Sequence, residues 1–132
     1  MPDGNLAIVK QAFDAFNRRD VDAFVALTAP NVRWYPVLPA RDGIQVYRGH
    51  AGVRDFMAGI AQDYMQAVAI PEELRSFHDR VLVFCRVVDV AVAADVDIKL
   101  ATAAVYHLHQ RLITRIHGFI DPAEAMLAAQ SG

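Results

Sequence analysis

Apolar residues recur at helical spacing near the start of the chain. Leu6, Val9, Phe13 and Phe16 lie three or four positions apart and share one face, which predicts a helix. Asn5 precedes this run and is a suitable residue to cap the helix. We therefore expect a first helix whose apolar face covers a core.

Two further helices are predicted from their start signals. Asp20 is placed to cap a short helix that Pro30-Asn31 ends. Another helix is expected from Gly49-His50 to about Ala67. Its apolar face is formed by Val53, Phe56, Met57, Ile60 and Tyr64.

The hydrophobic period changes to that of strands in the second half of the chain. The predicted strands are 32–35, 73–77, 80–92, 95–109 and 112–120, and a short helix over 123–129 follows them. Short connections cannot cross over a sheet, so the later strands are expected to be antiparallel. Residues 36–48 are predicted to form a loop, of a length that often carries function. The pattern predicts an α+β fold, with about three N-terminal helices packed on an antiparallel sheet.

Composition sets limits on the class of protein. A chain of 132 residues is expected to form a single domain, residues 1–132. Its apolar fraction of 55% is high, and a lined cavity or an oligomer interface would accommodate the excess. The net charge of −2, without a basic stripe, argues against nucleic acid and membrane partners.

The lone cysteine and the N-terminus bear on the compartment. Cys85 has no partner for an intrachain disulfide, and we interpret it as a buried thiol rather than a nucleophile. The first residues do not resemble a signal peptide, and no apolar run approaches about 18 residues. A cytoplasmic protein without a cofactor is expected.

Several segments resemble one known family when they are taken in order. They are Arg19–Phe24, Pro30–Trp34, Tyr47–Phe56, Asp79–Val83 and Ile113–Ile116. Together they resemble SnoaL-like domains of the nuclear-transport-factor-2-like superfamily, over nearly the whole chain. The resemblance implies a cone-shaped roll in which helices and a strongly curved sheet enclose an apolar pocket. The superfamily contains isomerases, cyclases, hydrolases and non-catalytic binding domains, so the fold does not fix the function.

The same resemblance implies that the usual acid/base residues are replaced. Tyr35 stands where ketosteroid isomerase-like relatives keep the catalytic base, and Ala12 stands at their tyrosine donor. Ala104, or Tyr106 with a shift in alignment, occupies the position of their acid. Gly118 occupies the position of the aspartate of the cyclases. Proton transfer of either kind is not expected from these positions.

Strand alternation predicts which residues line the pocket. The predicted lining residues are Trp34, Tyr35, Phe56, Ile60, Phe84, Arg86, Thr102, Tyr106, Ile116 and Gly118, with Ile120 on the same face. Such a surface suits a small hydrophobic or aromatic molecule. The alternative is that these side chains simply fill the core.

Arg86 interrupts an apolar strand and is the most informative polar residue. If it is buried, its guanidinium requires a partner, either an anionic group of a ligand or a protein carboxylate. The alternative is an arginine that pairs with a protein carboxylate or reaches solvent at the sheet edge. Tyr35, His50 and Asp121 are the other catalytic candidates. The alternative for His50 is helix capping or surface exposure, and the alternative for Asp121 is helix capping.

The outer face of the sheet carries three histidines, His107, His109 and His117, with Arg115. They could bind a divalent metal, but no carboxylate with ligand spacing accompanies them, so no metal is expected. Small residues such as Ala103 share this face. A homodimer through the outer sheet face is the preferred interpretation.

Three functions therefore remain open. The first is a binding domain for a small hydrophobic molecule. The second is an enzyme, isomerase-, cyclase- or hydrolase-like, that acts on such a molecule. The third is a dimeric interaction module with a collapsed cavity. An open pocket separates the first two from the third.

Overall fold

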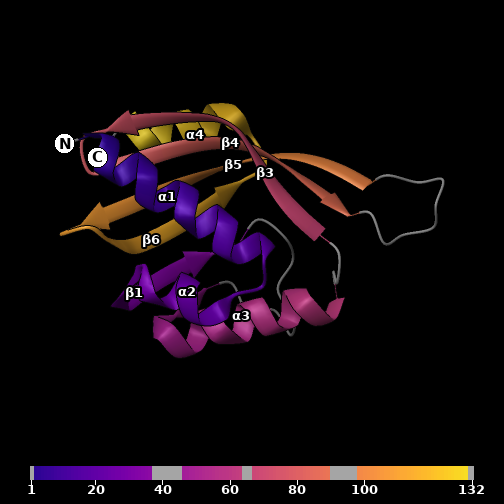
Figure 1. Cartoon of the computed structure of the whole chain (residues 1–132). Coiled ribbons are helices and arrows are strands. Elements are labelled where there is room, and N and C mark those ends of the chain that lie inside the picture. The colour runs from indigo at the N-terminus through magenta and orange to yellow at the C-terminus, as the bar shows by residue number, and fades with distance from the viewer. Residues whose placement is uncertain (1, 37–45, 64–66, 90–97, 131–132) are drawn as a thin grey trace.

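The computed structural model describes residues 2–36, 46–63, 67–89 and 98–130, which form four helices and six strands (Figure 1). The helices are α1 (Pro2–Asn17), α2 (Val21–Ala26), α3 (Gly49–Asp63) and α4 (Pro122–Gln130). The strands are β1 (Thr28–Tyr35), β2 (Tyr47–Arg48), β3 (Ala67–Phe77), β4 (Arg80–Asp89), β5 (Ile98–His109) and β6 (Leu112–Phe119). The α+β prediction is confirmed.

The six strands form one sheet in the order β2-β1-β6-β5-β4-β3. The meander from β3 to β6 is antiparallel, as its short connections require. β1 pairs with β6 in parallel, so the sheet is mixed rather than purely antiparallel. This pairing joins the first strand of the chain to the last and extends the sheet beyond the meander, with β2 and β3 at its two edges.

Helices lie on both sides of this curved sheet. In Figure 1, α1 and α3 lie across one side, whereas α4 lies on the other. The main core lies between α1, α2, α3 and the inner face of the sheet. A smaller cluster, with Leu82, Ala103 and Val105 from the sheet and Ala125 and Ala129 from α4, fills the outer side.

The helix ends show which capping signals are used. Asp20 accepts a hydrogen bond from the amide of Ala23 at 3.1 Å, which confirms it as the cap of α2. The prediction that Asn5 caps the first helix is wrong, because α1 already begins at Pro2. Proline is well tolerated in a first helical turn, where its missing N–H is not needed.

Several boundaries differ from those expected. The segment around Pro30 belongs to β1, so it does not separate helix from strand. β3 begins at Ala67, well before the expected start, and its register shifts between Pro71 and Glu73. This shift lets β3 accommodate Pro71, which has no N–H group to donate to a hydrogen bond with the neighbouring strand. Most of the predicted loop, residues 37–45, lies outside the described residues, and so do 90–97.

No helix among the residues that the structure describes is long and apolar enough to cross a membrane.

Candidate ligand cavity

A cavity of about 100 Å³ lies between the helices and the inner face of the sheet. The empty space reaches about 750 Å³ when the part that is open to solvent is included. Its walls are almost entirely apolar and come from α1, α2, α3 and five of the strands. The cavity is therefore open, and the core does not fill it.

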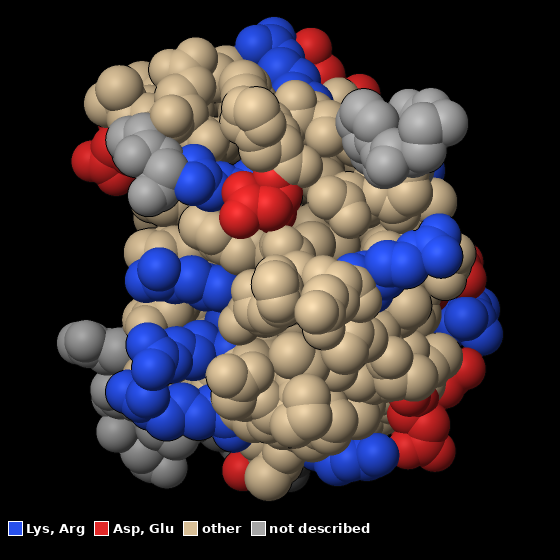
Figure 2. All heavy atoms as spheres, turned by 90° about the vertical axis from the view of Figure 1, so that its left-hand side faces the viewer, with Lys and Arg blue, Asp and Glu red and all other residues tan. Residues whose placement is uncertain are grey.

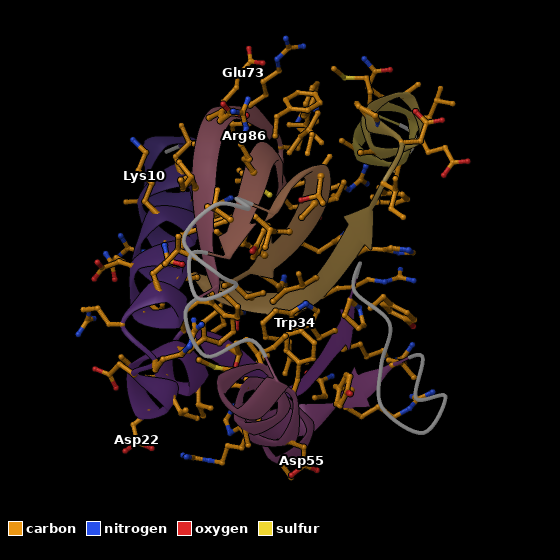
Figure 3. All side chains as sticks on the ribbon, turned by 90° about the vertical axis from the view of Figure 1, so that its right-hand side faces the viewer. Lys10, Asp22, Trp34, Asp55, Glu73 and Arg86 are labelled. Atoms are coloured by element: carbon orange, nitrogen blue, oxygen red, sulfur yellow. The ribbon has the colours of Figure 1, made fainter. Side chains whose placement is uncertain are left out.

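Trp34 forms an aromatic wall of this cavity. Its ring stacks on Phe24 at 5.1 Å and contacts Phe56 at 4.4 Å, and Phe16 lies 6.3 Å away. Figure 3 shows Trp34 inside the space that the curved sheet encloses. Because the cluster fixes its orientation, this indole presents a preformed flat surface to a ligand.

Three small residues in the wall leave part of the space between the aromatic side chains empty. Ala104 on β5 and Gly118 on β6 are direct partners in the sheet, and Ala12 on α1 lines the cavity with them. These are the positions at which the family resemblance places acid/base residues. Their replacement by small residues removes that chemistry and widens the cavity at the same time.

The cavity contains only a few polar groups among its described lining residues. Tyr106 is 6% exposed and lies against Phe13, with a ring distance of 5.8 Å. The Sγ of Cys85 and the Oγ1 of Thr102 are 3.1 Å apart and form a hydrogen bond with each other. These groups can orient a ligand by hydrogen bonding, but they add no charge.

Burial controls the protonation of these groups. Burial raises the pKa of the Tyr106 hydroxyl far above its ordinary value, with a smaller contribution from Cys85. Burial also raises the pKa of the Cys85 thiol, although the hydrogen bond with Thr102 acts in the opposite direction. Both groups keep their protons at neutral pH, so neither is an effective base or nucleophile.

Seven of the ten residues predicted to line the pocket do so in the structure. They are Trp34, Phe56, Ile60, Thr102, Tyr106, Ile116 and Gly118. They come from β1, α3, β5 and β6, for which the predicted alternation of inner and outer positions is correct. Whether they bind a ligand remains a prediction.

The prediction that Phe84 and Arg86 face the cavity is wrong. Cys85 pairs with Thr102, so on β4 it is Cys85 that shares the inner face with the cavity residues of β5. Phe84 pairs with Ala103 and packs toward α4 on the outer side. Alternation within one strand does not reveal its register against the next, and this missing register caused the error.

Arg86 does not reach the cavity. Its guanidinium lies 3.3 Å from the carboxylate of Glu72 on β3, and its side chain is 44% exposed. In Figure 3, Arg86 lies at the rim of the sheet, far from Trp34. The alternative interpretation, an arginine paired with a protein carboxylate near the sheet edge, is therefore the correct one.

Tyr35 also lies outside the cavity. Its ring stacks on His117 at 5.0 Å and lies 5.1 Å below the guanidinium of Arg115, on the outer face. Burial raises the pKa of Tyr35, but hydrogen bonds and charges from Arg33 and Arg115 outweigh it, so the net pKa is lowered. Ile120 is 67% exposed and does not line the cavity either.

The remaining catalytic candidates have structural roles. The Nε2 of His50 lies 3.1 Å from the carbonyl of Thr28, where it ties the start of α3 to β1. The Oδ1 of Asp121 accepts a hydrogen bond from the amide of Ala123 at 2.8 Å, at the start of α4. Neither residue lines the cavity, which supports the capping interpretation for Asp121.

The outer face of the sheet is partly covered by α4. Ala103 is fully buried beneath this helix, so it is not available for a contact with a second subunit. Arg33, Arg48 and Arg115 are exposed on neighbouring strands. Figure 2 shows that Lys and Arg side chains gather along one edge of the molecule.

The described residues contain no group of three or more His, Cys, Asp or Glu placed to hold a metal ion.

Sequence reasoning missed several cavity residues. Phe13 and Phe16 line it from the apolar face of α1, and Ala69, Cys85 and Val87 line it from β3 and β4. The helical spacing of the two phenylalanines could have identified them as cavity residues, because the apolar face of α1 packs against the sheet. Nothing in the sequence indicated Ala69, whose amide and carbonyl hydrogen-bond the side chain of Asn17.

The fold and the family of this chain are now defined. The SnoaL-like domain model matches residues 9–116, and the chain belongs to this family. No curated protein sequence matches it significantly.

Solved structures of low sequence identity share the cone fold. One is an NTF2-like protein of unknown function from Burkholderia pseudomallei, 24% identical, covering 98% of both chains with a TM-score of 0.77. TerC, co-crystallised with polyporic acid, is 20% identical, covering 96% of this chain and 98% of TerC with a TM-score of 0.77. The epoxide hydrolase/cyclase-like enzyme SalBIII, with a role in pyran ring formation in salinomycin, is 23% identical. The match covers 90% of this chain and 93% of SalBIII, with a TM-score of 0.72.

Proposed function

We propose that this protein binds a small hydrophobic or aromatic molecule in the cavity between its helices and its sheet. The observation that carries the proposal is the open, aromatic-walled cavity itself. An empty apolar cavity costs stability in proportion to its volume, because its walls lack packing partners. A ligand that fills it restores those contacts and buries its own apolar surface.

The shape of the wall supports a flat, ring-containing ligand. Trp34 lines the cavity and is held in place by Phe24 and Phe56, so this aromatic part of the wall is already formed. The similarity to TerC, which was co-crystallised with polyporic acid, is consistent with a small molecule in this fold. The enclosed volume of about 100 Å³, which opens to solvent, limits the ligand to about one ring, since an apolar cavity of about 150 Å³ accepts benzene.

An enzyme that acts on a hydrophobic substrate is the alternative. SalBIII, an epoxide hydrolase/cyclase-like enzyme, shares the fold, so such chemistry is compatible with the architecture. The described cavity residues include no carboxylate and no histidine, and the raised pKa values of Tyr106 and Cys85 make them poor bases. Binding therefore has more support than catalysis.

The single tryptophan provides a direct assay for binding. Ethylbenzene, a neutral one-ring probe, should shift the indole N–H resonance of Trp34 in a saturable titration followed by two-dimensional NMR. The resonances of exposed α4 residues such as Leu127 serve as the internal control. No shift at Trp34, or equal shifts throughout the protein, would count against the proposal.

We also propose that two copies associate through the outer face of β1 and β6. This face carries a stacked column of Tyr35, His117 and Phe119, in which Phe119 packs against the cluster beneath α4, whereas Tyr35 and His117 lie beyond that cluster. His117→Glu should convert a dimer to a monomer in sedimentation, whereas Asp55→Lys, on α3, should leave the dimer intact. A dimer that survives His117→Glu, or a monomeric wild-type protein, contradicts the proposal.

A further inference from the structure

Tyr106 lines an apolar cavity, and its hydroxyl has no hydrogen-bond partner in the part of the chain that the structure describes. Tyr106 is 6% exposed and lines the cavity from β5. Among the residues that the structure describes, none forms a hydrogen bond with this hydroxyl. Buried tyrosine hydroxyls usually find a partner, because an unmet donor costs stability.

The described neighbours of Tyr106 are mainly apolar. Its sheet partners are Val81 on β4 and Ile116 on β6, and the ring of Phe13 lies against it from α1. Thr102 and Cys85 form a hydrogen bond with each other, and Cys85 lies near enough to contribute to the raised pKa of Tyr106, but neither side chain forms a hydrogen bond with the Tyr106 hydroxyl. The hydroxyl is therefore free to donate to a molecule in the cavity.

The charge of the lining restricts the ligand further. None of the described lining residues carries a charge, and Arg86 is directed to Glu72 instead. An ionised carboxylate moved into such a site would lose its hydration without gaining a counterion, which is very costly. Carboxylate ligands are thus disfavoured, whereas a neutral oxygen can accept the hydroxyl proton.

We propose that the cavity selects neutral, ring-containing molecules with a carbonyl or ether oxygen, which accepts a hydrogen bond from the Tyr106 hydroxyl. The ring packs against Trp34, and the oxygen reaches Tyr106. This inference rests on the proposed binding function and adds the polar contact and the neutral charge of the ligand. It makes Tyr106 the specificity-determining residue of the site.

Three probes of similar size test the inference by calorimetric titration: acetophenone, ethylbenzene and benzoate. Acetophenone carries a carbonyl, ethylbenzene has no acceptor, and benzoate is an anion. Tyr106→Phe should weaken acetophenone binding about fivefold to tenfold, the value of one hydrogen bond, and leave ethylbenzene binding unchanged. Benzoate should bind at least about a hundredfold more weakly than acetophenone, since its charge stays unpaired.

The outcomes separate this inference from the proposed function. Ethylbenzene binding that Tyr106→Phe leaves intact shows that the variant keeps its cavity. If acetophenone binding is then also unchanged, or if both probes weaken equally, the hydrogen bond to Tyr106 is refuted while the binding function stands. Benzoate binding as tight as that of acetophenone refutes the neutral requirement. If no probe binds to the wild-type protein, the proposed function fails together with the inference.

Discussion

Filling the cavity should stabilise this protein, whereas the same change one residue away should destabilise it. Ala104 is 8% exposed and its side chain faces the cavity, next to Gly118. Ala104→Leu adds three carbon atoms, each worth about 0.8 kcal/mol when buried. Lost rotamer freedom offsets about 0.5–1 kcal/mol of this gain. The expected increase in the free energy of unfolding is about 1.5 kcal/mol.

The assay is thermal unfolding, combined with a titration of ethylbenzene. For a chain of 132 residues, the unfolding entropy converts this gain into a rise in Tm of about 5 °C. Ethylbenzene binding should be lost, because the leucine occupies the space of the ligand. In Ala104→Leu, a gain in stability should therefore accompany the loss of ethylbenzene binding.

Ala103→Leu is the matched control on the same strand. Ala103 also borders the cavity, but it is fully buried in the outer cluster with Ala125 and Ala129 of α4, so a larger side chain would have to displace this packing. Overpacking at this site should cost about 1–3 kcal/mol. If Ala104→Leu destabilises the protein as Ala103→Leu does, the inner side of the sheet is packed and the reasoning from the open cavity is refuted.

Three further predictions concern residues outside the cavity. Burial first, and then neighbouring arginine charges, lower the pKa of His107 and His117, so the unfolded chain binds protons more readily. Their contribution to stability should be complete above about pH 6.5 and decline as the pH falls below it, and the double change to glutamine should reduce this decline in urea unfolding. Asp121→Ala should lower stability by about 1 kcal/mol through the lost cap of α4, and Asp121→Asn should retain most of it in thermal unfolding. Arg86→Met should cost less than about 0.5 kcal/mol and leave ethylbenzene affinity unchanged, because the exposed pair with Glu72 contributes little; a loss of binding would contradict this placement.

The sequence predicted the elements better than it predicted their register. Asp20 and the apolar spacing of α1 identified two helices, because caps and helical faces are local signals. The parallel pairing of β1 with β6 was not predicted, since it joins strands that are about eighty residues apart in the chain. No local pattern specifies such a contact.

The cavity illustrates the same limit at the level of side chains. Residues 102, 106, 116 and 118 were assigned to the correct face, because one hairpin relates their strands. Arg86 was assigned to the wrong face, because the connection before β5 left the register of β4 undefined. An arginine in an apolar strand suggested a buried charge, whereas a register shift in β3 places Glu72 within reach.

The sequence predicted which residues lie on the outer face of the sheet, but not that α4 covers part of this face. The small side chain of Ala103 suggested close packing against another sheet, and close packing is present, but against α4 of the same chain. The helix itself was predicted, yet its docking position was not, because a short helix of alanines carries little directional signal. The surface that we propose for a second subunit is therefore the aromatic column of β1 and β6, away from α4.

A crystal structure with 4-bromoacetophenone tests the central claim most directly, because the anomalous signal of bromine locates the probe without ambiguity. We expect the ring to lie in the cavity against Trp34, Phe56 and Ile116, with its carbonyl oxygen within hydrogen-bond distance of the Tyr106 hydroxyl. Bromine found only on the outer surface, with the cavity closed by its own side chains, would contradict the account.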